Sequence, residues 1–369
     1  MKENWTYKKF EDCLDKVKYT SKVPSSDYLK DGLFPIVSQE EGLISGYWDE
    51  EGDVFKVQKP VVIFGDHTRI LKYVDFDFVL GADGVKILQP IDGLSAKFLL
   101  YYLTWCNIPS LGYSRHYKLL KELDTPVPPI ETQSRIVSEL DLLQSIIDKQ
   151  QAQLKELDKL AQSVFYDMFG DPVENEKGWE VKKLEEIVAE DCPISYGIVQ
   201  PGEGVANGVP VVRPVDMTNT FVFRFGLKQT TKEISDSYRR TILKGNEILL
   251  CVRGTTGLVA LASEELVGCN VTRGVAPIEC NEHNDRWFVF YQFLTKGIQQ
   301  YIADFTKGIA LKQINMKDVR EIPFIVPPLS SQHSFAAKIE SIEKQKSAIS
   351  QSIAETQKLF NYTMDKYFG

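Results

Sequence analysis

The chain carries an internal repeat, and this repeat limits the possible folds more than any single residue does. Segments of the first half recur in the second half, and the last part of the match is gap-free with the two copies 199 residues apart. The opening segments are only 174 residues apart, so the second copy is 25 residues longer in its middle. A unit that occurs twice predicts two structurally equivalent parts with related tasks. The repeated segments are Trp5–Asp12 with Trp179–Glu186, Lys118–Leu123 with Lys317–Ile322, Pro128–Gln133 with Pro327–Gln332, and Phe169–Gly170 with Phe368–Gly369.

The composition is that of an ordinary globular protein. Its 369 residues suffice for two or more domains, with 43% hydrophobic and 25% charged residues. No run of 18 apolar residues occurs, and the first residues do not resemble a signal peptide. The six cysteines have no Cys-x-x-Cys spacing and the four histidines are isolated, so we expect reduced thiols, no metal site and a cytoplasmic protein. A net charge of −8 does not exclude nucleic acid as a partner, because a DNA-binding protein needs only a local basic face.

Two segments, 130–170 and 330–369, have strong helical periodicity. Each follows a Pro-Pro pair, which cannot lie inside a helix, and apolar residues recur at spacings of three and four in the same register in both copies. This pattern predicts two helices that pair through a coiled-coil seam, with two separate amphipathic core helices as the alternative. The predicted seam residues are Ile136, Leu140, Leu143, Ile147, Leu154 and Leu157 in the first helix and Phe335, Ile339, Ile342, Ile349, Ile353 and Phe360 in the second.

The segments outside the helices predict α+β domains. Short β-like runs such as 60–64, 209–212 and 247–252 are separated by Gly, Asp and Asn. Helix-like stretches follow at Ala96–Cys106 and Arg286–Gln300, without a regular alternation of strand and helix.

Chain geometry favours an antiparallel helix pair. A helix over 131–169 is about 58 Å long. The linker 171–178 that follows it reaches at most about 28 Å. A parallel pair would place the second globular part a full helix length from this linker. We therefore predict two globular parts joined by two antiparallel helices as a pseudo-two-fold dumbbell whose chain ends lie close together.

Polar residues make the two copies of the seam unequal. Under antiparallel pairing, a self-paired first half sets Ile147 against Leu157, whereas a self-paired second half sets Lys346 against Thr356. A lysine at a seam position costs stability and specifies the partner. We expect the first half to self-pair more tightly than the second.

The sequence contains no recognisable catalytic motif. It has no phosphate-binding Gly-x-x-x-x-Gly-Lys-Ser/Thr loop, no Gly-x-Gly-x-x-Gly turn and no Gly-x-Ser-x-Gly elbow. The carboxylates are scattered and predict no acid–base pair. These observations favour a binding protein over an enzyme.

Loops at equivalent places in the two globular parts contain residues suited to DNA. Glycine lets the backbone approach a phosphate, hydroxyl groups and lysine contact phosphates, and arginine reaches guanine edges. A single Arg-Gly turn is more often a solvated hairpin, but recurrence in both parts favours binding. The candidate DNA-binding residues are His67, Arg69, Arg115, His116, Tyr117 and Lys118 in the first part and Arg253, Thr255, Thr256, Arg273, Lys307 and Lys312 in the second.

Together these features resemble the specificity subunit of Type I restriction–modification systems over the whole chain. The resemblance rests on the duplicated α+β part, the Phe-Gly endings, the Pro-Pro-x-x-x-Gln entries at Pro128–Gln133 and Pro327–Gln332, and Leu243–Leu249 with Arg253–Gly257. The first part departs from the family pattern because Gly65–Arg69 lacks the second glycine. The resemblance implies target-recognition domains over 1–129 and 171–329 and conserved spacer helices over 130–170 and 330–369.

The same resemblance implies a non-catalytic subunit that recognises a bipartite, asymmetric DNA site. Its helices would dock two modification subunits, which bind S-adenosylmethionine and methylate adenine. Restriction subunits would use ATP and magnesium, and this chain would hold no cofactor. The alternatives are a chain that itself methylates or cuts DNA, the specificity chain of a fused-subunit restriction system, and a coiled-coil scaffold without DNA binding.

Overall fold

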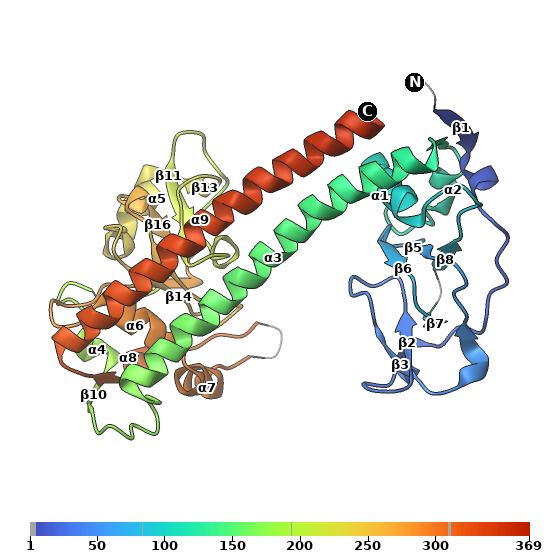
Figure 1. The fold of residues 1–369 in the computed structure, drawn as a ribbon. Helices are drawn as coiled ribbons and strands as arrows, with labels where there is room; N and C mark the ends of the chain where they lie inside the picture. Colours follow the sequence, from blue (N-terminus) through green and yellow to red (C-terminus); the bar gives the residue numbers. More distant parts are fainter. Residues whose placement is uncertain (1–4, 83, 193, 309–310) are drawn as a thin grey trace. The chain divides into compact units, whose positions relative to one another are not determined.

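The chain forms two compact units of mixed helix and sheet (Figure 1). The structure, a computed structural model, describes residues 5–82, 84–192, 194–308 and 311–369. Unit 1 comprises residues 1–151 and 351–369, and unit 2 comprises residues 152–350. None of the helices in the described part of the chain is both long and apolar enough to span a bilayer. The predicted α+β class is confirmed.

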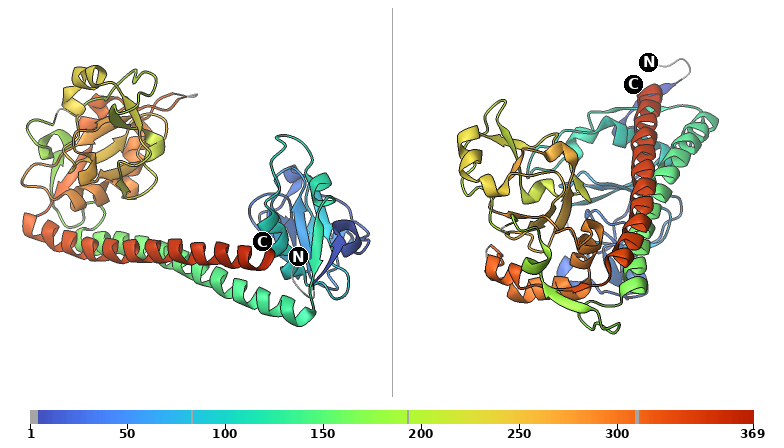
Figure 2. Two further views of the ribbon diagram at one scale, coloured as in Figure 1. Left: turned by 90° about the horizontal axis from the view of Figure 1, so that it is seen from above. Right: turned by 90° about the vertical axis from the view of Figure 1, so that its left-hand side faces the viewer.

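Two helices of 40 residues each, α3 (Ile130–Phe169) and α9 (Leu329–Phe368), pass from one unit into the other. Each begins directly after its Pro-Pro pair, as expected. Unit 1 contains the first part of α3 and the last part of α9, and unit 2 contains the remaining parts. Figure 2 shows the second part of α3 and the first part of α9 side by side along the globular part of unit 2.

The pairing is antiparallel within each unit. In unit 1, the Tyr367 hydroxyl donates to Glu139 at 2.5 Å and the Gln150 amide donates to Ser352 at 2.7 Å. In unit 2, Lys346 Nζ lies 2.8 Å from Asp158 Oδ1, and the rings of Phe165 and Phe335 are 5.6 Å apart. In each unit, residue numbers fall along α9 as they rise along α3, which confirms the antiparallel prediction.

The seam is buried where a globular core covers it and half-buried elsewhere. Eight predicted seam residues lie in the two main cores, whereas Leu154, Leu157, Ile349 and Ile353 are only half-buried. The buried members are Ile136, Leu140, Leu143, Ile147 and Phe360 in unit 1 and Phe335, Ile339 and Ile342 in unit 2.

The end of α3 is buried along a different line from the one that the periodicity predicts. Phe165 and Phe169 are fully buried, whereas Val164 and Met168 of the predicted register are half-buried. Both phenylalanine rings pack on Phe288 of the globular part, at 5.7 and 4.8 Å between centroids. The last turns of α3 therefore face the domain core as well as α9.

The repeated sequence segments form equivalent strand pairs. In unit 1, β1 (Thr6–Lys9) pairs antiparallel with β9 (Asp124–Val127). In unit 2, β10 (Glu180–Lys183) pairs antiparallel with β18 (Pro323–Val326). Each pair joins the beginning of a globular part to its end, directly before the long helix.

A buried glutamine fixes each long helix to its globular part. Gln133 accepts from the backbone N–H of Ser95 at 2.7 Å and donates to the carbonyl of Pro128 at 2.7 Å. Gln332 accepts from the backbone N–H of Asp285 at 2.8 Å and donates to the carbonyl of Pro327 at 2.9 Å. Both glutamines are 0% exposed. Because Ser95 and Asp285 are the N-caps of the domain helices, these bonds link the start of one helix to the start of another.

The sheets of the two globular parts have matching strand orders in the described part of the chain. The order β6-β5-β8 in unit 1 corresponds to β15-β14-β17 in unit 2, and β3-β2-β7 corresponds to β13-β11-β16. The edge strands β4 and β12 are extra to this match. The strands of unit 1 are β2 (Phe34–Val37), β3 (Gly46–Trp48), β4 (Val54–Phe55), β5 (Val61–Gly65), β6 (Leu71–Val74), β7 (Phe78–Leu80) and β8 (Val85–Leu88). Those of unit 2 are β11 (Val209–Val212), β12 (Phe221–Val222), β13 (Lys228–Thr230), β14 (Ile248–Cys251), β15 (Val259–Ala262), β16 (Asn270–Val271) and β17 (Val275–Ile278).

The domain helices show one of the places where the second copy is longer. Unit 1 has α1 (Ala96–Cys106), as predicted, but the stretch predicted over 286–300 is two helices, α6 (Arg286–Phe293) and α7 (Lys296–Phe305). The break follows the buried Thr295, whose hydroxyl donates to the carbonyl of Gln292 at 2.7 Å. Short helices complete the fold: α2 (Tyr117–Leu120), α4 (Leu184–Ile187), α5 (Lys232–Ser237) and α8 (Met316–Arg320).

The glutamine clamp predicts a local loss of stability on truncation. Gln332→Ala leaves the N–H of Asp285 and the carbonyl of Pro327 without their partners, so we expect the free energy of unfolding to fall by roughly 2–4 kcal/mol. Thermal unfolding combined with hydrogen exchange of unit 2 measures the effect. Gln345→Ala, at an exposed position of the same helix, is the control. Equal shifts in both variants would contradict the clamp.

Candidate nucleic-acid interface

Three predicted loops of unit 2 meet at the end of β14. The N–H of Val252 donates to Gly274 at 2.8 Å, and the N–H of Gly254 donates to Lys312 at 2.9 Å. The N–H of Ile314 donates to the carbonyl of Val252 at 3.1 Å. These backbone bonds hold together the loop after β14, the turn between β16 and β17, and the loop between α7 and α8.

The loop between α7 and α8 closes as a hairpin. Lys307 and Gln313 exchange two backbone hydrogen bonds of 2.8 Å, and Thr306 lies 3.2 Å from Thr256 through their hydroxyls. Residues 309–310 of the predicted segment lie outside the described residues. Lys307 and Lys312 are exposed on this hairpin.

One predicted cation of unit 2, Arg273, lies over a tyrosine ring beside these loops. The Arg273 guanidinium lies over the ring of Tyr196 at 5.9 Å, and the amide of Gln313 donates to the Tyr196 hydroxyl at 3.2 Å. Among the residues that the structure describes, no carboxylate forms an ion pair with Arg253, Arg273, Lys307 or Lys312. With Thr255 and Thr256 between them, these side chains form a locally positive, hydrogen-bonding surface, which we call the unit 2 loop cluster.

A fourth loop of the unit 2 loop cluster was not predicted. Arg213 follows β11, and its guanidinium donates to both carboxylate oxygens of Asp216 at 3.0 and 2.8 Å. The hydrogen bonds that the guanidinium donates to Asp216 raise the pKa of Arg213 and fix the direction of the guanidinium. The next residue, Pro214, packs on the Arg273–Gly274 turn so closely that a Cβ at Gly274 would lie 2.7 Å from Pro214 Cγ. The sequence signal was an Arg-Pro-x-Asp segment directly after a β-like run.

Unit 1 places its loops on an equivalent backbone frame. The N–H of Asp66 donates to Gly84 at 2.6 Å, and the N–H of His116 donates to Asp66 at 2.8 Å. These bonds match those that join Val252 to Gly274 and to Ile314 in unit 2. The loop after β5, the turn before β8 and the loop before α2 therefore meet as their counterparts do.

Two of the side chains that were predicted to contact DNA in unit 1 instead pack or bond within the unit. His116 is 0% exposed; its Nδ1 faces the Asp66 carbonyl at 2.9 Å and its Nε2 accepts from the N–H of Leu111 at 2.9 Å. His116 is therefore a structural residue, which corrects its assignment as a DNA contact. Tyr117 is half-buried, with Lys86 and Lys121 over its ring at 5.4 and 5.6 Å, and burial raises its pKa.

The other predicted residues of unit 1 remain accessible. Arg115 and Lys118 are exposed, and His67 is half-buried beside the fully exposed ring of Tyr113, at 6.1 Å between ring centroids. Arg69 adopts a positive φ of 64° and donates from Nη1 to the carbonyl of Ile108 at 3.0 Å. Tyr113 belongs to this surface and lies in the same predicted loop as Arg115 and Lys118. We call these five residues the unit 1 loop cluster.

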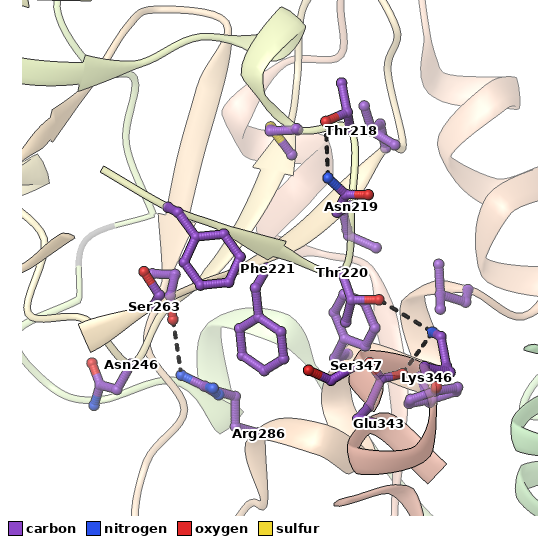
Figure 3. A pocket seen from close by; sticks show the side chains of 18 of the residues that line it. Thr218, Asn219, Thr220, Phe221, Asn246, Ser263, Arg286, Glu343, Lys346 and Ser347 are labelled. Carbon is purple, nitrogen blue, oxygen red and sulfur yellow. Dashed lines mark hydrogen bonds and ion pairs between the residues drawn. The ribbon is translucent and has the colours of Figure 1, made fainter. Parts of the chain in front are cut away.

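Unit 2 also contains a cavity of about 1430 Å³ between its parts of the long helices and its sheets (Figure 3). Lys346 of α9 lies on its wall and contacts Glu343 at 2.7 Å, Asp158 of α3 at 2.8 Å and the Thr220 hydroxyl at 3.4 Å. Burial lowers the pKa of Lys346, but its bonds to Asp158 and Glu343 outweigh burial and raise it. Lys346 is therefore a charged, fully partnered residue. Within the described part of the chain, no three His, Cys, Asp or Glu side chains group as metal ligands.

Two equivalent α+β parts, each with a loop cluster on the same backbone frame and joined by paired helices, define a duplicated recognition protein. The chain belongs to the family of Type I restriction modification DNA specificity domains, whose sequence pattern it matches over residues 2–159 and 176–357.

The chain is similar to named members of this family. It is 25% identical over 282 residues to the Type I restriction enzyme EcoBI specificity subunit of Escherichia coli, with 68% of this chain and 59% of the relative covered. It is 23% identical over 371 residues to the EcoR124I/EcoR124II specificity subunit of the same organism, with 94% and 89% covered. A third relative is the MjaX specificity subunit of Methanocaldococcus jannaschii, at 26% identity over 243 residues with 61% and 53% covered. The chain thus spans less than two thirds of the length of the EcoBI and MjaX relatives.

Solved structures share the fold. The S subunit of a Type I restriction–modification system from M. genitalium aligns over 99% of this chain and 96% of its own, with a TM-score of 0.57 and 14% identity. A chain from a study of complex assembly and conformational transition in the type I R-M system aligns over 100% and 98%, with a TM-score of 0.52 and 17% identity.

The buried position of His116 predicts an effect on stability. His116→Ala removes the side-chain partner of the Leu111 N–H, so we expect the free energy of unfolding to fall by roughly 1–3 kcal/mol. Arg115→Ala, at the exposed neighbouring position, should change it by less than about 0.5 kcal/mol. Denaturant unfolding of both variants makes the comparison. A stable His116→Ala variant would show that the ring is not structural.

Proposed function

We propose that the chain is a non-catalytic subunit that recognises a bipartite, asymmetric DNA site, with one loop cluster reading each part. The observation that carries this proposal is the shared backbone frame: in each unit, three loops meet through matching hydrogen bonds at the ends of corresponding strands. Base recognition needs side chains held by a rigid scaffold, and two such scaffolds in one chain suit a site with two parts.

The charges of the unit 2 loop cluster support DNA as the ligand. Arg253, Arg273, Lys307 and Lys312 lie together without described ion-pair partners, in a chain of net charge −8. Cations placed in this way neutralise phosphates, and arginine pairs with the O6 and N7 atoms of guanine. Arg213 is held by Asp216 through two side-chain bonds, which reduces the freedom it loses on contact with a base edge.

The different side chains of the two loop clusters support an asymmetric site. The unit 1 loop cluster presents the imidazole of His67, the phenol of Tyr113 and three cationic side chains. One of these cations, Arg69, donates a hydrogen bond to the carbonyl of Ile108. Unit 2 presents arginines, lysines and two threonines. Two surfaces with the same frame and different donors should read different bases.

Exposed apolar residues on the long helices support docking of two modification subunits. In unit 1, α3 exposes Leu142 and Ile146, and α9 exposes Leu359 and Tyr362, whose side chain is 67% exposed. In unit 2, Leu160 is 49% exposed. Apolar side chains on a helix pair in water favour a protein partner. We assign S-adenosylmethionine to these modification subunits, and ATP and magnesium to restriction subunits. A fused modification–restriction chain would meet the same helices.

A bipartite recognition site has a direct signature in the host. We expect methylated adenines in a motif of two short specific parts separated by a gap of several base pairs, so that the two parts lie about one DNA turn apart. Methylome sequencing of cells with and without the gene provides the test. If methylation that depends on the gene occurs in a continuous motif without a gap, the proposal that each unit reads one part of the site is wrong.

Arg253 and Lys307 should differ in their effect on binding. Arg253→Ala should change the preference for matched over scrambled duplex by roughly 1–3 kcal/mol, because it removes a base contact. Lys307→Ala should weaken binding to both duplexes alike and lower the slope of log affinity against log salt by about one, because it removes a phosphate contact.

Titrations of the assembled complex at several salt concentrations measure both quantities. Lys344→Ala, an exposed lysine on α9 outside the loop cluster, is the matched control. Unchanged affinity in both test variants would mean that these loops are only solvated. Absence of all duplex binding would favour the helical scaffold without DNA recognition.

A further inference from the structure

In unit 2, an ion pair links the two long helices: Lys346 of α9 contacts Asp158 of α3. The Lys346 side chain is only 16% exposed, and that of Glu343, its neighbour on the same helix, is 13% exposed. Asp158 comes from α3 and is 57% exposed at its side chain. In unit 1, the two helices are linked by Gln150 with Ser352 and by the more exposed pair Lys366 and Glu139, at 3.9 Å.

The internal repeat shows which residues stand at the corresponding places in the other copy. With the 199-residue offset, Lys346 corresponds to Ile147, and Asp158 corresponds to Gln357. Ile147 is 2% exposed within the core of unit 1. Lys346 and the carboxylate that it meets across the helix pair therefore sit on different copies of the helix, whereas Glu343 accompanies Lys346 on the second copy.

This division has a consequence for self-pairing. If a second copy of α9 took the place of α3 at the 158–346 contact, Lys346 of a self-paired second half would face Gln357 of its mate, one residue beyond the predicted Thr356. Each of two lysines, whose side chains are only 16% exposed, would then lose the charge-assisted contact across the helix pair and keep only the contact with Glu343. A self-paired first half would place Ile147 against Asp158, which is exposed enough to turn toward water.

We propose that Lys346 and Asp158 act as a pairing-selectivity device: the second half of the chain accepts a helix with a carboxylate at the place of Asp158 and rejects a second copy of itself. The partner that fits this surface is the first half of this chain, or of another chain of the same kind with an acid at that place. A charged residue at a seam position commonly selects the partner at some cost in stability. This inference is independent of DNA binding.

The test starts from the folded full chain. A protease site inserted between Glu176 and Lys177, both exposed in the turn after α3, allows cleavage into two halves that the helix pair still holds. Unlabelled and isotope-labelled preparations are mixed at a urea concentration at which labelled first halves exchange. Native mass spectrometry then counts the pairs. For the wild type, we expect first–second pairs throughout and second–second pairs at least tenfold less abundant.

Substitutions separate the device from general seam stability. Lys346→Ile should raise the second–second pairs at least tenfold, whereas Lys344→Ile, the same change at an exposed position of α9, should not. Asp158→Lys should weaken first–second pairs at least tenfold and spare first–first pairs, because it faces Lys346 in the former and Ile147 in the latter. In a chain that carries both substitutions, Lys346→Ile should restore the first–second pairs that Asp158→Lys weakens.

Two results would overturn the proposal. One is a wild type that forms second–second pairs as readily as first–second pairs. The other is a Lys346→Ile chain that pairs like the Lys344→Ile chain. Should Lys346→Ile fail to fold, the Asp158→Lys chain alone decides, because equal weakening of first–first and first–second pairs would contradict the charge contact.

Discussion

The attachment of each long helix to its globular part depends on one buried amide side chain. Gln133 and Gln332 satisfy a backbone N–H at the start of a domain helix and a carbonyl in the Pro-Pro turn, in surroundings that water does not reach. An unpaired polar group there would be costly, so the positions of the turn, the domain helix and the long helix are fixed together. The terminal strand pairs lie beside this point, and these are the segments in which the two copies of the sequence agree. The loops diverge because they carry no such constraint.

The parts of the fold that sequence predicted are those whose signal is local. The helix periodicity, the Pro-Pro starts and the apolar strand runs each lie within one segment, and chain length alone decided between parallel and antiparallel pairing. Burial along the helices was predicted less well. Leu154 and Ile349 follow the heptad pattern but are half-buried because no core covers them, whereas Phe165 and Phe169 are buried by a domain helix far away in sequence.

The candidate site shows the same division. Sequence singled out three loops in the second globular part and two in the first, since glycine, hydroxyl and basic residues cluster within each segment, and the loops singled out in each unit lie together in the structure. Sequence could not separate an exposed side chain from a buried one. His116 is a residue type that often contacts DNA, but here its ring is buried and bonds to the backbone groups of Leu111 and Asp66. Tyr196 and Arg213 were missed because their places in the loop cluster depend on contacts between residues far apart in the sequence. Tyr196 contacts Gln313 and Arg273, and Pro214, next to Arg213, packs on Gly274.

The sharing of both helices between the units determines the order in which the chain can fold during synthesis. Unit 2 needs only residues 152–350, so all of its parts are available before the last helix is complete. The core of unit 1 includes Phe360, Met364 and Tyr367, so the part of the protein that is made first must wait for residues that are made last. An interrupted chain therefore lacks a finished first unit even when every residue of its sheets is present. Such a chain leaves apolar side chains of the unit 1 core uncovered, which makes it prone to aggregation.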